Sequence, residues 1–566
     1  PEGFTFEPKR QRVAIARHDP QSSSVVVQSS LVGSSTLRSY VPNWMDRVSE
    51  ADKNKLDSAF ANIIFSTGVP FRFADSPALA IFVHLARPAY TPPSAKLIAG
   101  PLLDRAHAQM ENSMSAFMDN QPIVSLVSDG WTSMRNDHMV NFVAVFPLKT
   151  ARPVFVKAIA TDDISQTGVN IAAELDRAIV AIGVSKVGSV VTDDAACMKS
   201  AWKILEQKYP GLICNGCAAH AVNLLIKDVC KLEVFANALE RARDVTSFVK
   251  DRNALTKRFE RIQETLLVDG EISSKRALSS VVATRWYTHY NCIARVLENR
   301  KVLAQLANTA LFQDLKVTSG SRVKKAAFVD AITDATFWSN LQSMEATLRP
   351  TCSIIGKFEG DTCCLSDVYR LFLELRAHWS TSDELTELLL DRWAFIHTES
   401  MGFAYFLDPT TRAGEGMFED DLYDNARLLQ EFVLVKKQIS SNVEAVRTEL
   451  ANFVDAMKNP SDKAKFFIEQ CATPMTYWHQ VGSTKFPILC AVARIVFSVP
   501  TSQAASERVW SIYDFILTKR RNRLSPAKVT KLVQLYMNAD LSRGSLVSVM
   551  MGQESDAGES DDETKT

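Results

Sequence analysis

Two aspartates follow short apolar runs of the chain. Ile123–Val127 is apolar and β-branched and precedes Asp129, and Val187–Val191 is a second such run that precedes Asp193. The backbone holds residues at strand ends rigidly, so neighbouring strands can deliver two carboxylates to one site. Converging carboxylates repel one another unless a positive charge lies between them. Oxygen ligands of this kind favour Mg²⁺ or Mn²⁺, and two such ions can activate an attacking oxygen and stabilise a leaving one.

The same aspartates also have a simpler interpretation. An Asp after a strand is commonly a turn former or a helix N-cap, and Asp129-Gly130 is a common turn pair. Asp194 stands directly beside Asp193, and the pattern does not decide which of the two would bind metal and which would cap the next helix. On spacing alone, the structural role is the commoner one. A metal site also needs a third carboxylate from a neighbouring element.

Cys214-x-x-Cys217-x-x-His220 has the spacing of half a zinc site. Structural zinc takes four ligands, typically as two separated pairs, and no second pair stands nearby in the sequence. The spacing therefore favours a role in the core or at a helix cap over zinc binding.

A basic run lies near the C-terminal end, with four cations in five positions: Lys519, Arg520, Arg521 and Arg523. Such a run is typical of a solvated helix face. Contact with DNA phosphates is the second interpretation, and the run also has the composition of a weak nuclear import signal.

The elements that would position the aspartates alternate in a recognisable order. We expect strands at 123–127, 139–146 and 153–159, a helix at 170–182, a strand at 187–191, a helix at 198–208, a strand at 212–214 and a helix at 219–231. A hairpin followed by helix–strand units is typical of a ribonuclease H-like layer and differs from the plain alternation of a doubly wound fold. From about Leu232 to Arg494 the apolar pattern is helical almost throughout.

Composition limits the function classes. The 566 residues favour two to four domains. Lys+Arg and Asp+Glu number 64 each, so a nucleic-acid partner would need a local basic face. No run of 18 apolar residues occurs, and we expect no membrane segment. Ten scattered cysteines favour a reducing compartment.

Several motifs, in order along the chain, resemble the hAT transposases. They are Ala89–Ser94 (AYTPPS), Ser128–Thr132 (SDGWT), Val191–Ala196 (VTDDAA), Cys217–Leu224 (CAAHAVNL), Thr284–Trp286 (TRW), Ala404–Pro409 (AYFLDP), Ser502–Ser511 (SQAASERVWS) and Lys519–Pro526 (KRRNRLSP). Together they cover roughly residues 85–540. The resemblance implies an acidic triad of Asp129, Asp193 and Glu507 that binds metal and catalyses DNA cleavage.

The resemblance also implies a fold: α/β, with a ribonuclease H-like core that is interrupted by a large all-α insertion. C-terminal helices would complete the core and form the dimerisation region. The predicted segments are a flexible lead over 1–43, a helical N-terminal region over 44–120, the first part of the core over 121–234, the helical insertion over 235–490, the C-terminal dimerisation region over 491–540 and an acidic disordered tail over 541–566.

The resemblance assigns further residues to DNA. Cys217 and His220 form a CxxH motif near the active site, where His220 would contact DNA, although a core or capping role for the pair stays open. Arg285 and Trp286 match the family's Arg-Trp motif, whose Trp would stack on a distorted nucleotide during hairpin formation in the flanking DNA. The alternative for Trp286 is a buried anchor at the point where the insertion leaves the core.

The implied function is a nuclear DNA transposase that uses Mg²⁺ or Mn²⁺ to cut and join strands, acts on transposon ends and target DNA, and forms a homodimer or a larger homo-oligomer. The alternative is a domesticated, non-catalytic protein that binds DNA and dimerises. Many relatives begin with a BED-type zinc finger, which residues 1–120 cannot form because they contain no cysteine. We expect such a finger either upstream of Pro1 or lost from this copy.

Overall fold

The computed structural model describes residues 47–133, 136–146, 152–161, 165–282, 287–315, 319–358, 360, 363–518, 521 and 523–541. Four predicted features lie outside these residues: the lead over 1–43, the Arg285–Trp286 pair, the first two cations of the basic run, Lys519 and Arg520, and the tail beyond Leu541.

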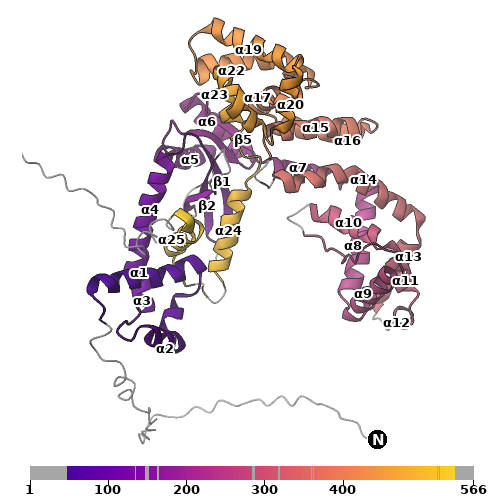
Figure 1. The fold of residues 1–566 in the computed structure, drawn as a ribbon. Helices are drawn as coiled ribbons and strands as arrows, with labels where there is room; N and C mark the ends of the chain where they lie inside the picture. Colours follow the sequence, from indigo (N-terminus) through magenta and orange to yellow (C-terminus); the bar gives the residue numbers. More distant parts are fainter. Residues whose placement is uncertain are drawn as a thin grey trace, which may run out of the picture.

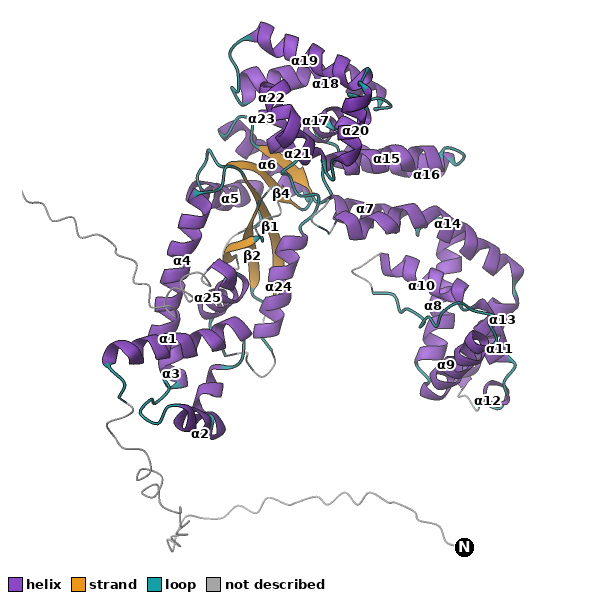
Figure 2. Ribbon diagram, viewed as in Figure 1, coloured by secondary structure: helices purple, strands orange, loops and turns teal. Residues whose placement is uncertain are grey.

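A five-stranded mixed sheet forms the centre of the structure (Figures 1 and 2). Its strands are β1 (Val124–Thr132), β2 (His138–Val145), β3 (Val154–Ala160), β4 (Val187–Thr192) and β5 (Ile213–Gly216). Their order across the sheet is β3-β2-β1-β4-β5. The β1–β2 and β2–β3 pairs are antiparallel, whereas β4 runs parallel to both β1 and β5. The expected hairpin followed by helix–strand units is confirmed.

The sheet separates two apolar cores because successive side chains of a strand point to opposite faces. Leu126 and Val190 belong to one buried cluster, whereas Val127 and Val191 belong to the other. Burial on both faces explains why the first five residues of β1 and all of β4 are buried without alternation.

Strand register places the two aspartates of the predicted triad level with each other. Val127 pairs with Val191, and continuing this parallel register by two places brings Asp129 beside Asp193, directly after β4 ends. One expectation was wrong: Asp129 does not follow its strand. β1 continues to Thr132 because β2 pairs with it on the other side, with Asn141 opposite Asp129.

Helices that precede β5 or lie near the C-terminal end pack on the sheet or on one another. They are α1 (Glu50–Thr67), η1 (Phe71–Asp75), α2 (Pro77–Ala86), α3 (Ala95–Leu97), η2 (Ile98–Leu102), α4 (Leu103–Asp119), α5 (Gly168–Ile182), α6 (Ala196–Lys208), α24 (Ala504–Ile516) and α25 (Pro526–Met537). In α5, apolar residues at helical spacing are buried, and Thr167 caps the first turn. α24 packs on β1 and β2, and α25 packs on β3, α4 and α1.

Between β5 and α24 the described residues form helices and no strand. The helices are α7 (Ala218–Val229), α8 (Glu233–Lys250), α9 (Asn253–Val268), α10 (Tyr287–Glu298), α11 (Arg300–Ala307), α12 (Ala310–Gln313), α13 (Ser319–Thr333), α14 (Ala335–Phe358), α15 (Leu365–Trp379), α16 (Asp383–Ile396), α17 (Glu399–Leu407), η3 (Pro409–Thr411), α18 (Glu419–Glu431), η4 (Phe432–Lys436), α19 (Val443–Lys458), α20 (Asp462–Gln470), α21 (Pro474–Tyr477), η5 (Trp478–Gly482), α22 (Ser483–Lys485) and α23 (Pro487–Val496). In the part of the chain that the structure describes, no helix is both long and apolar enough to cross a membrane.

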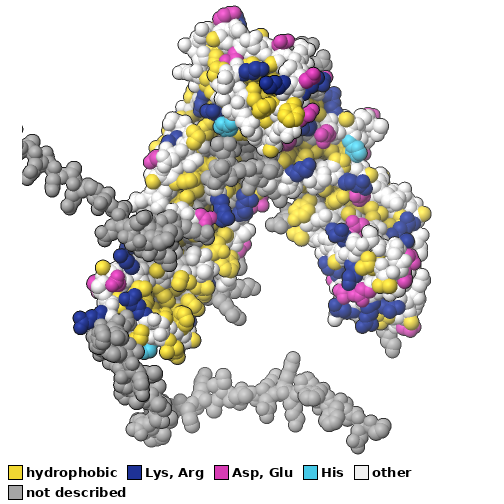
Figure 3. Space-filling view, viewed as in Figure 1, with side chains coloured by type: hydrophobic (Ala, Val, Ile, Leu, Met, Phe, Trp, Pro, Cys, Tyr) yellow, Lys and Arg dark blue, Asp and Glu magenta, His cyan; other side chains and the backbone are white. Residues whose placement is uncertain are grey.

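The helices of this block form an arm and a cap (Figure 1). α8 to α13 stand away from the sheet as an arm, which α7 and α14 connect to the rest, whereas α15 to α23 gather above the sheet. Figure 3 shows an open notch between the arm and the lobe that holds α1 to α4. We expected the chain to leave the core near Trp286. That expectation was wrong, because α8 and α9 already belong to the arm.

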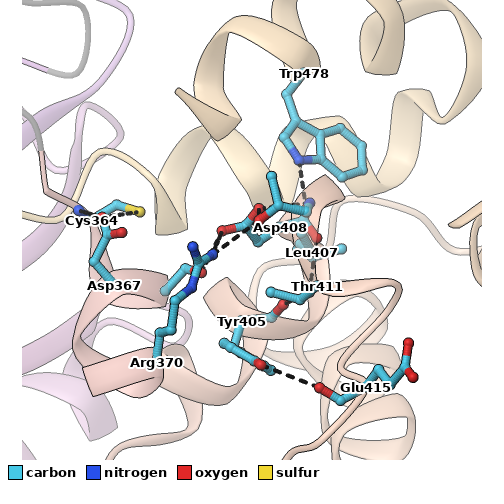
Figure 4. Close-up of polar contacts among 11 residues, drawn as sticks. Cys364, Asp367, Arg370, Tyr405, Leu407, Asp408, Thr411, Glu415 and Trp478 are labelled. Carbon is cyan, nitrogen blue, oxygen red and sulfur yellow. Dashed lines mark hydrogen bonds and ion pairs between the residues drawn. The ribbon is translucent and has the colours of Figure 1, made fainter. Parts of the chain in front are cut away.

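A buried carboxylate, Asp408, anchors the cap (Figure 4). It accepts hydrogen bonds from Ser366 Oγ (2.5 Å), from Arg370 Nη2 (3.1 Å) and from the backbone and hydroxyl of Thr410. The preceding carbonyl, of Leu407, accepts from Trp478 Nε1 at 2.9 Å. These bonds join α15, α17 and η5, which gives the AYFLDP motif a structural role.

The large apolar side chains between about Phe486 and Asn538 predict a C-terminal segment that packs on the helical block and exposes an apolar surface for self-association. Only α23 does the first, through α17, α19 and η5, whereas α24 and α25 pack on the sheet and the N-terminal helices. Nearly all of the expected apolar residues are buried or half-buried within the chain: Val496, Phe497, Val509, Trp510, Ile512 and Ile516. Phe515, which is 54% exposed, is the exception.

Candidate active site

Asn141 connects the first aspartate of the predicted triad to the helix that carries the distant glutamate. Its side chain is fully buried on β2, directly opposite Asp129. The Asn141 Oδ1 atom accepts a hydrogen bond from Asp129 N at 3.3 Å, and Nδ2 donates to Ser506 O at 3.0 Å. Because Glu507 follows Ser506, this bridge holds the first turn of α24 against the strand that bears Asp129.

The segment before α24 is fastened to the sheet at further points. Gln503 Nε2 donates to Ser128 O at 2.6 Å, and Ser125 Oγ donates to Ser498 O at 2.9 Å. Ala218 N, at the start of α7, donates to Thr501 O at 2.9 Å. These bonds fix where the chain returns from the helical block. The structure therefore brings Glu507 to the sheet, as the predicted triad requires.

Electrostatics places three carboxylates within reach of one another. Burial and the negative charges of Glu507 and Asp193 together raise the pKa of Asp129 to about 7, against the Gly130 N–H, which lowers it. Among the described residues, however, no group of three or more His, Cys, Asp or Glu side chains is arranged to hold a metal ion. The carboxylates therefore share one electrostatic environment without forming a preorganised cation site among the described residues.

The neighbouring acids Asp193 and Asp194 have different environments. Asp193 Oδ1 accepts a hydrogen bond from Ala195 N at 3.0 Å, at the beginning of α6. Asp194 is buried, and neither of its carboxylate oxygens meets a hydrogen-bond donor among the described residues. Burial raises its pKa to about 7. Its carboxylate lies against Gly216 of β5, where an added Cβ would come within 2.0 Å of Oδ1, so only glycine fits there. Asp193 is thus the one whose charge acts on Asp129.

Cys217 and His220 lie at the start of α7, with opposite exposure. The Cys217 thiol is buried, and its Sγ accepts from His220 N and from Gln503 N, each at 3.4 Å. Burial raises the pKa of this thiol to about 12. The thiol therefore caps α7 and holds the segment before α24, and His220 is the member of the pair that faces solvent.

The described part of the basic run has two environments. The Arg521 guanidinium is half-buried and donates to the carbonyl oxygens of Gly68 and Val69, after the end of α1. Arg523 is exposed. In this structure Arg521 is engaged within the chain, which leaves Arg523 as the more accessible cation of the two.

Sequence reasoning missed Asn141, Gln503 and a tryptophan pair beside the site. Trp131, two residues after Asp129 on β1, stacks on Trp510 of α24, with ring centroids 5.2 Å apart and planes 13° from parallel. Trp510 stands three positions after Glu507 and so lies on the same side of the helix. Both tryptophans belong to motifs that also contain a triad carboxylate: Trp131 is in SDGWT with Asp129, and Trp510 is in SERVW with Glu507. This shared position could have predicted that they lie beside the site. Asn141 carries no such signal, since it is a single polar residue inside an apolar strand.

Removing the Asn141 side chain is expected to weaken both folding and catalysis. Asn141→Ala removes the side-chain acceptor of Asp129 N–H and the side-chain donor to Ser506 O, and a buried group that is left unpaired costs about 1–3 kcal/mol. Asn141→Asp is the matched variant, because it keeps an acceptor for Asp129 N–H and loses the donor to Ser506. If Asn141 positions Glu507, both variants lower kcat more than they raise KM in a DNA-cleavage assay. A change in KM alone would contradict this role.

Three family models match parts of the chain. Residues 93–245 match a domain of unknown function, DUF659, and residues 216–326 match the ZBED1 RNase-like helical domain. Residues 452–539 match the hAT family C-terminal dimerisation region. No curated protein matches the chain. The first two matches cover the sheet and the first helices of the arm, and the third ends in the helices that carry Glu507 and pack on the sheet.

Proposed function

The chain belongs to the hAT superfamily of transposases and transposase-derived proteins, and from this premise we propose that it is a metal-dependent DNA transposase with Asp129, Asp193 and Glu507 as its catalytic carboxylates. The observation that carries the proposal is geometric: strand register sets Asp129 beside Asp193, and the Asn141 bridge to Ser506 holds the start of the Glu507 helix against the same strand. Carboxylates from distant parts of a sequence that repel one another at a sheet edge are costly, and a cation site gives a reason for the arrangement.

We also assign the core to the ribonuclease H-like class. The supporting observation is the strand order β3-β2-β1-β4-β5, with an antiparallel hairpin next to parallel strands. In that assignment the helices α8 to α23 form an insertion, and α24 completes the core.

The donor set fits a hard divalent cation. All three groups supply carboxylate oxygens, which Mg²⁺ and Mn²⁺ prefer. The buried Asp194 carboxylate, which meets no hydrogen-bond donor in the described part of the chain, adds to the negative potential nearby. Asp129, Asp193 and Glu507 would hold the metal. When bound, it would supply counter-charge for the attacking and leaving oxygens of a phosphodiester. The chain's own part is to keep Asp129 on a rigid strand, Asp193 fixed by Ala195 N, and Glu507 held through Ser506 and Asn141.

DNA is the proposed substrate, and a basic groove on the arm supports it. Four cations line this groove of about 580 Å³ between the end of α8, the segment before α10 and α10 itself: Lys250, Lys275, Arg276 and Arg295. No acid lines it. Lys275 and Arg295 form ion pairs with Glu264 and Glu298. Among the described residues, Lys250 and Arg276 therefore supply the uncompensated charge of the groove, whereas in the adjoining cavity two cations are matched by two acids. For a chain with zero formal net charge, such a local face is what phosphate binding requires.

Charge reversal in the groove is expected to weaken DNA binding. Lys250→Glu with Arg276→Glu removes two exposed cations, neither of which makes an ion pair among the described residues. The log–log salt dependence of binding should become shallower by about two, because each lost phosphate contact lowers the slope by about one. The matched control, Arg258→Glu with Arg261→Glu on α9 of the same arm, changes the net charge equally and should bind nearly as wild type does. Fluorescence anisotropy in EDTA measures DNA affinity. An equal loss of affinity in the groove variant and in the control would contradict a contact that is specific to the groove.

The test of the proposed activity is nicking of a duplex that carries a transposon end and its flanking DNA. With Mn²⁺ or Mg²⁺, wild type should cut, and Asp193→Asn should not. DNA binding without cutting by wild type would favour the domesticated, non-catalytic alternative. We propose nuclear localisation on the same premise, since the substrate is chromosomal DNA.

A further inference from the structure

Helix α2 is apolar except for His84, and none of its residues is buried. Leu79 and Val83 are partly covered by the core. Ala78, Ile81, Phe82 and Leu85 follow helical spacing along a second stripe that faces outward. The last three side chains are 62%, 68% and 71% exposed. A helix of this composition is normally covered, and a contiguous exposed apolar surface marks an interaction site.

The surface around α2 continues toward the region matched as the dimerisation region. Phe73 of η1, against which α2 packs, and Ile63 of α1 are also exposed. Phe515 of α24 is exposed and lies against Gly68 at the end of α1, beside Tyr536 of α25. Figure 3 shows hydrophobic side chains gathered over the lobe of α1 to α3. α1 itself packs on α25, so this lobe borders residues 452–539 directly.

The apolar side chains inside α24 do not provide an interface. Val509, Trp510 and Ile516 are buried against the sheet and its neighbouring helices. An outside partner that contacts α24 would therefore meet Phe515 rather than these buried side chains.

We propose that α2 is a self-association surface, whose outward stripe packs against the same stripe of a second copy of the chain. The charge pattern favours a second copy: α2 contains no Asp, Glu, Lys or Arg, so two identical helices can meet without opposing like charges. An interface about a twofold axis needs such self-complementarity. Contact with the dimerisation region through α1 and Phe515 makes the stripe continuous with the part of the chain for which the family model indicates dimerisation. This inference is independent of DNA cleavage.

Light scattering on the full chain at micromolar concentration tests the proposal. Wild type should have twice the mass of the 62.9 kDa chain, and Phe82→Glu with Leu85→Glu should be monomeric with an unchanged circular dichroism spectrum. The matched control is Val268→Glu with Val323→Glu, which introduces the same charges at exposed apolar positions of the arm, outside residues 452–539, and should remain dimeric.

Three results would overturn the proposal. A monomeric wild type would mean that another occupant covers α2, such as a segment of the same chain or a different protein. A dimeric α2 variant would place the interface elsewhere. Equal dissociation of the α2 variant and the control would show a general effect of added charge. Because both pairs alter exposed side chains, the fold is expected to survive in either variant.

Discussion

Asp129→Asn is expected to abolish DNA cleavage while the protein stays folded and still binds DNA. Asp193→Asn and Glu507→Gln should do the same, each with a loss of at least about 10²–10³-fold. Each change keeps the shape of the side chain and removes one of the charges that would attract the cation. DNA binding should persist, because phosphate contacts come from cations such as those of the arm groove. Single-turnover nicking together with anisotropy separates the two effects.

Asp194→Asn is the matched control for these variants, because it removes an adjacent carboxylate that faces Gly216. It is expected to cut nearly as wild type does. Loss of cleavage in Asp194→Asn, with activity kept in Asp193→Asn, would show that the metal ligand is the neighbour. Activity in all three triad variants would exclude the proposed triad altogether.

The sheet was predictable because its strands are strongly patterned. Val187–Val191 is a short apolar run with nothing helical in its spacing, and β4 forms there almost to the residue. The hairpin of β2 and β3 was predictable for the same reason. β1 was not, because its second half, Ser128–Thr132, is polar and glycine-containing, and pairing with β2 rather than local propensity makes it a strand.

The return of α24 to the sheet came from family resemblance and not from local pattern. Nothing within Ala504–Ile516 encodes which surface its apolar face covers, and tertiary contacts decide it: Gln503 with Ser128, Ser506 with Asn141, and Trp510 with Trp131. The same limit explains the wrong expectation for the C-terminal surface. The apolar composition of α24 indicated that Val509, Trp510 and Ile516 need burial. It could not indicate that the sheet buries them, nor that α2 is the helix left exposed.

Stability of the metal-free protein is expected to fall as pH rises from 5.5 to 8. The folded-state pKa of Asp129 is about 7, well above the value of about 3.9 for an unfolded chain, and that of Asp194 is likewise about 7. Between these pKa values the folded state holds protons that the unfolded state has released. Unfolding is then favoured by up to about 1.4 kcal/mol per pH unit for each group, and the dependence ends above the folded-state pKa.

Thermal unfolding in EDTA at pH 5.5 and pH 8 measures this dependence. The fall in midpoint temperature should be smaller in Asp129→Asn, because one of the two groups no longer titrates. Mg²⁺ at pH 8 should raise the midpoint of wild type, since an ion that binds only the folded state stabilises it and offsets the repulsion from Glu507 and Asp193. In Asp129→Asn the ion should have a smaller effect. Equal Mg²⁺ stabilisation in both proteins would mean that the cation binds elsewhere, because a ligand of the site cannot be removed without weakening the ion's preference for the folded state.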